Sequence, residues 1–279
     1  MHLVIIISII ASIIAGVGTG LVGLSAATAI TPLLIKCGVP AHQAIYIALI
    51  SDVVASAFTS REYTLNGHLL KNNGEGNTNL PITWLVFGFT IFFTLVGAYV
   101  SSKVTEKGVG TVAFYVSLFV AVKFVSEFVS SQKHTEKFNP KAMSKLFTGL
   151  KTCSNDVVII VATIIGGAVI GLSSGFAGVG GGMTMLIVFG AFGYKLKDAV
   201  CVSTLTMVFV AMIGGLFHYC LNDKMAGATN GWTILSICVV ATTLSAWITS
   251  KFANKCDDKY HKLLCGILLL VALIVTKIF

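Results

Sequence analysis

Two glycine clusters flanked by small hydroxyl side chains hold the residues whose types and spacing could bind a ligand. The candidates in the first cluster are Gly20, Gly23, Ser25 and Thr28. Those in the second are Ser173, Ser174, Gly178, Gly180, Gly181, Gly182 and Thr184. Glycine leaves backbone N–H groups open to a ligand, and hydroxyls donate hydrogen bonds. Both clusters could therefore bind an anion through neutral donors.

The density of glycine predicts that helices break at these clusters. Gly166–Gly182 contains eight glycines in 17 residues, and each costs about 1 kcal/mol in a helix interior. We therefore expect no continuous helix through Gly16–Gly23 or Gly166–Gly182. Close helix packing is the alternative explanation, but the triplet Gly180–Gly182 favours a break. Half-helices that start after the breaks would direct free N–H groups and a positive dipole end at an anion.

Ionisable side chains inside apolar runs form a second set of candidates. Asp52 and Lys123 lie at similar depths, where a charge costs about 2.5–3.5 kcal/mol on insertion scales, so each needs a partner or a watery cavity. An Asp52–Lys123 ion pair and a role in the anion path or in proton coupling are both open. Glu127 is an alternative partner for Lys123. His218 is either a packed histidine or a proton relay.

The motifs of zinc proteases and ATPases are absent from the sequence. It has no HExxH or Walker A pattern, and its seven cysteines are scattered without CxxC spacing. We expect no enzymatic activity, no cofactor and no bound metal. Any transport would draw on ion gradients or the membrane potential.

The elements that must position these residues are apolar helices. Of 279 residues, 56% are hydrophobic and 11% are charged, whereas soluble domains carry about 25% charged residues. Apolar runs are predicted at 3–17, 26–35, 39–60, 80–100, 109–130, 157–172, 183–194, 198–221, 231–250 and 262–278. The chain is thus predicted to be an all-α, polytopic integral membrane protein with about 8–10 helical segments. Its net charge of +8 reports membrane topology and not nucleic-acid binding.

An internal repeat divides the chain. A shift of 155 residues aligns the first glycine cluster with the second, and a later pair aligns at a shift of 148. We predict a five-segment repeat at 1–131, a Lys-rich linker at 132–156 and a second five-segment repeat at 157–279. An odd number of crossings per half would invert the second half. The two breaks would then meet near the membrane midplane.

Lysine and arginine predict the orientation. They gather mainly on the side that contains the central linker, so this loop is predicted to be cytoplasmic and both termini outside. The cell membrane is the expected location. The expected partners are the lipid bilayer and a small anion, and homo-oligomer formation is left open.

The second half resembles the TauE/SafE-type sulfite exporter family. That family repeats a motif close to GxxxGxxGxGGG, and residues 171–182 read GLSSGFAGVGGG. Gly193, Ala199 and Ser203 then follow the family pattern, as does the small-residue stretch that ends at His218. The first half matches less closely, because Ser25-Ala26-Ala27 replaces the glycine triplet.

The resemblance implies a secondary permease for sulfite, organosulfonates or similar small anions, usually directed outward. It places Ser203 and Thr204 in the substrate cavity, although such hydroxyls also join membrane helices through ordinary hydrogen bonds. Uptake of another small anion is one alternative function. A non-transporting membrane scaffold or sensor is the other, in which the glycines serve helix packing.

Overall fold

The computed structural model describes residues 2–68, 80–105, 156–177, 181–191, 196–220 and 231–256, with single positions at 108, 111, 115, 118, 122 and 267. The elements in these ranges are helices: α1 (His2–Val22), α2 (Ala27–Lys36), α3 (Ala41–Leu65), α4 (Leu80–Ser101), α7 (Asp156–Ala177), α8 (Gly181–Ala191), α9 (Leu196–Cys220) and α10 (Gly231–Ala253). The predicted all-α class is confirmed. The predicted runs 109–130 and 262–278 lie almost entirely outside the described residues.

Helix length separates two kinds of element. Among the described residues, α1, α3, α4, α9 and α10 are each long and apolar enough to cross a membrane. In contrast, α2 has 10 residues and α8 has 11. At 1.5 Å per residue each reaches about 15 Å, half of a hydrocarbon core of about 30 Å. The half-helices therefore begin where the glycine pattern predicted them.

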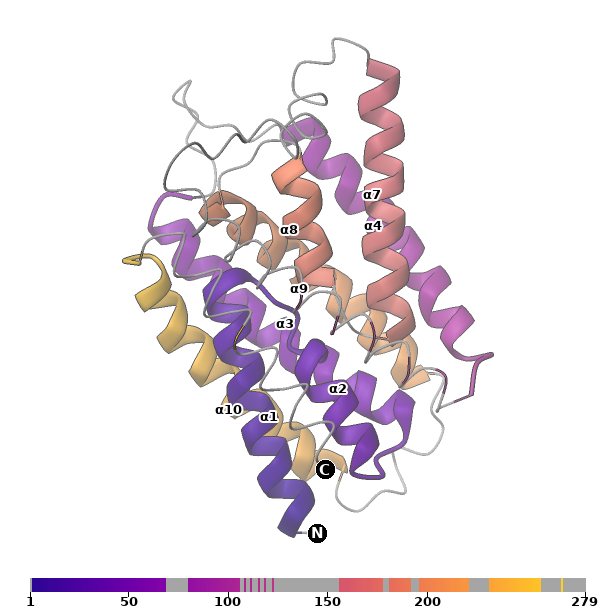
Figure 1. Ribbon diagram of the computed structural model, residues 1–279, viewed down its shortest axis with the longest axis vertical. Coiled ribbons are helices and arrows are strands. Elements are labelled where there is room, and N and C mark those ends of the chain that lie inside the picture. Colours follow the sequence, from indigo (N-terminus) through magenta and orange to yellow (C-terminus); the bar gives the residue numbers. More distant parts are fainter. Residues whose placement is uncertain are drawn as a thin grey trace.

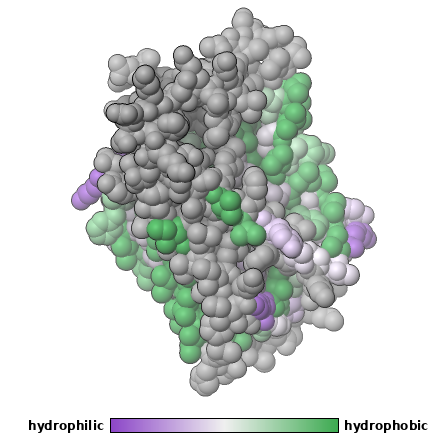
Figure 2. All heavy atoms as spheres, viewed as in Figure 1, coloured by the Kyte–Doolittle hydropathy of each residue, from purple (hydrophilic) through white to green (hydrophobic). Residues whose placement is uncertain are grey.

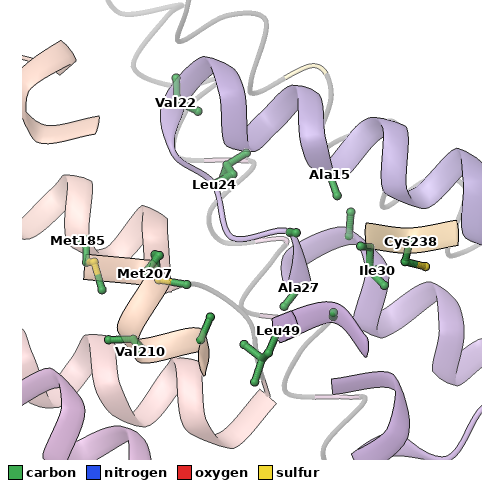
Figure 3. Packing of buried hydrophobic residues seen from close by; sticks show 14 of the residues in the cluster. Ala15, Val22, Leu24, Ala27, Ile30, Leu49, Met185, Met207, Val210 and Cys238 are labelled. Carbon is green, nitrogen blue, oxygen red and sulfur yellow. The ribbon is translucent and has the colours of Figure 1, made fainter. Parts of the chain in front are cut away.

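The helices form a bundle with α3 and α9 in the middle (Figure 1). On one side α1 packs along α10, and on the other α4 packs along α7. Both half-helices are short pieces beside the central pair, α2 next to α3 and α8 next to α9. Buried apolar residues from all eight of these described helices join in one cluster, part of which Figure 3 shows.

Apolar side chains also cover the outside of the bundle. Figure 2 shows hydrophobic residues along its outer faces. Examples are the exposed Ile10 of α1, Phe92 of α4 and Leu244 of α10. Such large exposed apolar surface is unfavourable in water and is typical of helices that face lipid. The protein is therefore an integral membrane protein with several membrane-crossing helices.

Neither glycine stretch is one continuous helix, as predicted, but the break lies only near the end of each stretch. Helix α1 continues through Gly16 and Gly20 as far as Val22, and α7 continues from Asp156 to Ala177. The physical reason is close packing. A Cβ on Gly20 would overlap the Ala246 carbonyl oxygen of α10 and lie 3.0 Å from the backbone nitrogen of Ser250. These glycines are retained in helices because they allow two backbones to touch.

Helix α7 makes the corresponding contact with α4. A Cβ on Gly171 would lie 2.8 Å from the backbone nitrogen of Thr94, and one on Gly175 would lie 2.8 Å from that of Ala98. The 155-residue shift aligns Gly20 with Gly175, and the 148-residue shift aligns Ala98 with Ala246. Each contact thus joins the first helix of one predicted half to the fourth helix of the other. The helices of the two predicted halves are therefore interleaved, and the repeat and its inversion stay predictions.

Candidate functional site

The first break begins at Gly23. Its φ of +65° is left-handed, which suits glycine, and its N–H donates to the Thr19 carbonyl oxygen at 2.9 Å, as in a helix cap of the αL type. The buried Tyr63 hydroxyl of α3 donates to the Leu21 carbonyl oxygen at 2.8 Å. The carbonyls of Thr19 and Leu21, in the last turn of α1, therefore have partners although they lie inside the bundle.

A carboxylate already occupies the N-terminus of α2. Asp52 of α3 is fully buried and accepts hydrogen bonds from the hydroxyls of Ser25 at 2.7 Å and Ser56 at 3.1 Å. The backbone N–H of Ala26 binds the same carboxyl group. No cation pairs with Asp52 among the described residues, and Lys123, its predicted partner, lies outside them. In this structure Ser25, one of the predicted donors at this break, therefore binds the Asp52 carboxyl group.

The two breaks meet. A Cβ on Gly182 would overlap the Gly23 carbonyl oxygen and lie 2.9 Å from the backbone nitrogen of Ser25. Gly23 also contacts α9, because a Cβ on Gly23 would lie 2.8 Å from the Ser203 hydroxyl and 3.1 Å from the Thr204 methyl carbon. The structure therefore brings five predicted site residues, from both halves, into one place.

The N-terminus of α8 has a different environment from that of α2. A Cβ on Gly181 would lie 3.2 Å from the Ser174 hydroxyl of α7 and 2.6 Å from the Met207 sulfur of α9. Ser174 is fully buried, and its hydroxyl has no hydrogen-bond partner within the described part of the chain. Such a buried donor costs about 1–3 kcal/mol when it is left unsatisfied. A ligand oxygen at this helix end would give the hydroxyl a partner. Gly178 and Gly180 lie outside the described residues.

The other predicted hydroxyls are engaged locally. Those that donate to carbonyl oxygens of their own helices are Ser173, Thr184, Ser203 and Thr204. Thr28 lines a cavity of about 10 Å³ between α1 and α2, which has room for about one water molecule. Gly20 lies within α1 against α10, apart from the other candidates.

Closely packed atoms surround the meeting point of the breaks. A larger cavity, of about 340 Å³, opens elsewhere, at the ends of α1, α2, α3 and α10. Its lining includes Cys37, Gln43 and Thr233 and none of the predicted site residues.

His218 closes one end of the α3–α9 pair. It is fully buried, and its Nε2 lies 2.9 Å from the Gly175 carbonyl oxygen. A carbonyl only accepts, so Nε2 carries the proton and Nδ1 of the neutral ring is an acceptor. The Nδ1 of His42 lies 3.1 Å away and donates to it. His218 thus joins α9 to α3 and α7, as a packed histidine would.

A second histidine contact lies at the other end of the same helix pair. His68 follows α3, and its Nδ1 is 3.1 Å from an Asp198 carboxylate oxygen in the first turn of α9. Because α3 and α9 run antiparallel, these two contacts lie on opposite sides of the glycine site.

Sequence reasoning missed Ser56, Tyr63, His42 and Met207. A signal did exist for two of them. Asp52, Ser56, Thr59 and Tyr63 follow an i, i+4, i+7, i+11 spacing, which places them on one face of a helix, and all four are buried. Met207 carried no signal, because a methionine in an apolar run is typical of any membrane helix.

Comparison with known families identifies the chain. The family described as "Sulfite exporter TauE/SafE" matches residues 8–276. No curated relative and no solved structure matched the chain. The match includes every described helix except the first residues of α1.

Proposed function

Because the chain belongs to the sulfite exporter TauE/SafE family, we propose that it is a secondary transporter that exports sulfite or a small organosulfonate. The observation that carries the proposal is the N-terminus of α8. There, a half-helix end that favours anions meets the other break beside the buried, unpartnered Ser174 hydroxyl.

Within this proposal the substrate anion binds at the second break. The first N–H groups of α8 and the Ser174 hydroxyl donate to its oxygens, and Gly178 and Gly180 are further proposed binding residues. Gly182 and Gly23 let the two breaks approach, and Ser203 and Thr204 form the wall behind them. Neutral donors suit an oxyanion, since they bind it without the cost of burying a fixed cation.

The first break contributes a resident charge. As long as the Asp52 carboxylate holds Ser25 and Ala26, these donors do not reach the substrate. The carboxylate also repels a second anion close to it, and a low dielectric strengthens that repulsion. Protonation of Asp52 would remove the repulsion, so anion binding and proton uptake would favour one another. Lys123 is a further candidate for balancing this charge.

Two histidine contacts supply the gates. Access from one side requires separation of α3 and α9 at His42 and His218, and access from the other requires separation at His68 and Asp198. A carrier opens one end at a time around a fixed site. In the proposed orientation the Lys-rich linker 132–156 is cytoplasmic, both termini are outside, and the two halves are inverted in the cell membrane.

Sulfite flux through the purified full chain in liposomes, with imposed pH gradients and potentials, tests the proposal. We expect saturable flux that small sulfonates compete for. A potential of 100 mV changes the driving force by about 2.3 kcal/mol per net charge moved, so the voltage dependence reports the coupling. The direction of gradient-driven accumulation separates export from uptake.

A matched pair of variants ties flux to the site. Leucine at Gly181 would collide with Met207 and Ser174, whereas Gly88 of α4 has open space around it. We expect Gly181→Leu to abolish flux and Gly88→Leu to retain it, with both proteins folded. If the folded wild-type protein transported neither sulfite nor any other small anion, the result would favour a function as a membrane scaffold instead.

A further inference from the structure

Met207 covers the N-terminus of α8. It is fully buried in α9, and its sulfur and methyl carbon would lie 2.6 Å and 3.1 Å from a Cβ on Gly181. It belongs to the buried cluster of Figure 3. The same position of Gly181 faces the Ser174 hydroxyl. The thioether and the unpartnered hydroxyl therefore border one small volume at the helix end.

The described contacts of Gly182 and Gly23 at this helix end involve backbone atoms and short side chains. Gly182 abuts backbone atoms of Gly23 and Ser25, and Gly23 abuts Ser203. These contacts can separate only if whole helix ends move. Methionine is unbranched and has three rotatable bonds, so its end can swing away while the backbone stays in place. Met207 is therefore a flexible neighbour of this helix end that an entering anion can displace without movement of the backbone.

We propose that Met207 sets the largest anion that the transporter accepts. The inference rests on the proposed function and deepens it. The oxygen atoms of the sulfite or sulfonate group accept hydrogen bonds from the α8 N–H groups and Ser174. Any carbon substituent on the substrate sulfur must then share space with the displaced side chain of Met207. Sulfite, which has no carbon substituent, fits most easily. Bulkier organosulfonates are rejected by volume.

The chemistry of the thioether suits this position. It is uncharged, so it does not repel the anion. It is also only a weak acceptor, so it does not compete for the Ser174 hydroxyl. A carboxylate or amide at this position would do one or the other. Met207 therefore selects by size without weakening the binding of the oxyanion group.

The test measures transport of sulfite, methanesulfonate and a longer alkanesulfonate by the full chain in liposomes. Wild-type flux should fall along this series. In Met207→Ala, loss of Cγ, Sδ and Cε should raise the ratio of alkanesulfonate to sulfite flux at least about tenfold, as expected when a pocket gains room for extra methylene groups. Met207→Leu keeps the bulk and should keep the wild-type ratio. Met212→Ala removes a thioether that is 41% exposed on the same helix and is the matched control.

The outcomes separate the two proposals. No flux of any of the three anions through folded wild-type protein would overturn the proposed function. Sulfite flux with the same selectivity in wild type and in Met207→Ala would overturn the role of Met207 alone. Equal flux of all three anions through the wild-type protein would also overturn the role of Met207. Should Met207→Ala fail to fold, Met207→Val makes a smaller change and should move the ratio in the same direction.

Discussion

Replacement of Gly182 by alanine tests whether the two breaks touch as the structure has them. The new Cβ would overlap the Gly23 carbonyl oxygen and lie 2.9 Å from the backbone nitrogen of Ser25. Both are backbone atoms next to a cap with φ of +65°, so neither can turn away as a side chain would. Overpacking of this kind costs about 1–3 kcal/mol. Because the atoms that the new Cβ meets belong to the backbone, we expect a loss of stability in the upper part of that range.

The loss should appear in both stability and transport. For a chain of this size, 1 kcal/mol lowers Tm by about 2–4 °C, so Gly182→Ala should melt several degrees below wild type. If the strain instead separates the breaks, 3 kcal/mol corresponds to a loss of about 100-fold in the population with an intact site. Flux is measured per folded protein in liposomes, and melting is followed in detergent.

Gly88→Ala is the control for the glycine change itself. Gly88 lies in α4 with no atom near its added Cβ, and alanine is the better helix former by about 1 kcal/mol. This variant should keep wild-type flux and an equal or higher Tm. If Gly182→Ala also kept both wild-type values, the contact between Gly182 and Gly23 would be refuted, and the site built on it would fall with it.

Three further substitutions probe the polar groups around the breaks. Asp52→Asn keeps the shape of the side chain but cannot exchange a proton, so the pH dependence of flux should flatten; an unchanged pH profile at normal expression would exclude Asp52 from coupling. Ser174→Ala removes a buried hydroxyl without a partner in the described protein, so Tm should stay unchanged or rise, while the KM for sulfite should rise about tenfold. A lower Tm with an unchanged KM would contradict the role of Ser174 as a donor to the ligand. His218→Phe leaves the Gly175 carbonyl and His42 without this partner. A buried group left unsatisfied costs about 1–3 kcal/mol of stability, so Tm should fall by several degrees. A wild-type melting curve would show that the contact does not hold α3 to α9.

The class of the protein and the position of its half-helices could be predicted from sequence because both are local properties. Hydropathy over about 20 residues predicts a membrane-crossing helix wherever the rest of the chain lies. Gly23 ends α1 because glycine readily adopts a positive φ. The start of α8 at Gly181 lies within the glycine triplet, a pattern that is also local in sequence. Motif spacing, likewise local, indicated the family that the chain matches over residues 8–276.

The function of most glycines could not be predicted in this way. Gly20 and Gly175 resemble Gly23 in sequence, yet they remain inside helices because α10 and α4 come close to them. A glycine that breaks a helix and one that packs against a helix look the same until the neighbour is known. The neighbours here come from the other half of the chain, far away in sequence.

Hydrogen-bond partners divide in the same manner. The sequence by itself determined that a carboxylate and several hydroxyls would be buried in an apolar bundle, since composition and periodicity place them inside helices. Only the tertiary structure decided that Asp52 would occupy the N-terminus of α2, 27 residues from Ser25, while Ser174 would remain unpartnered beside α8. A buried polar group must find its partner among the atoms that packing brings within about 3 Å, and the packing of one helix against another depends on the whole bundle.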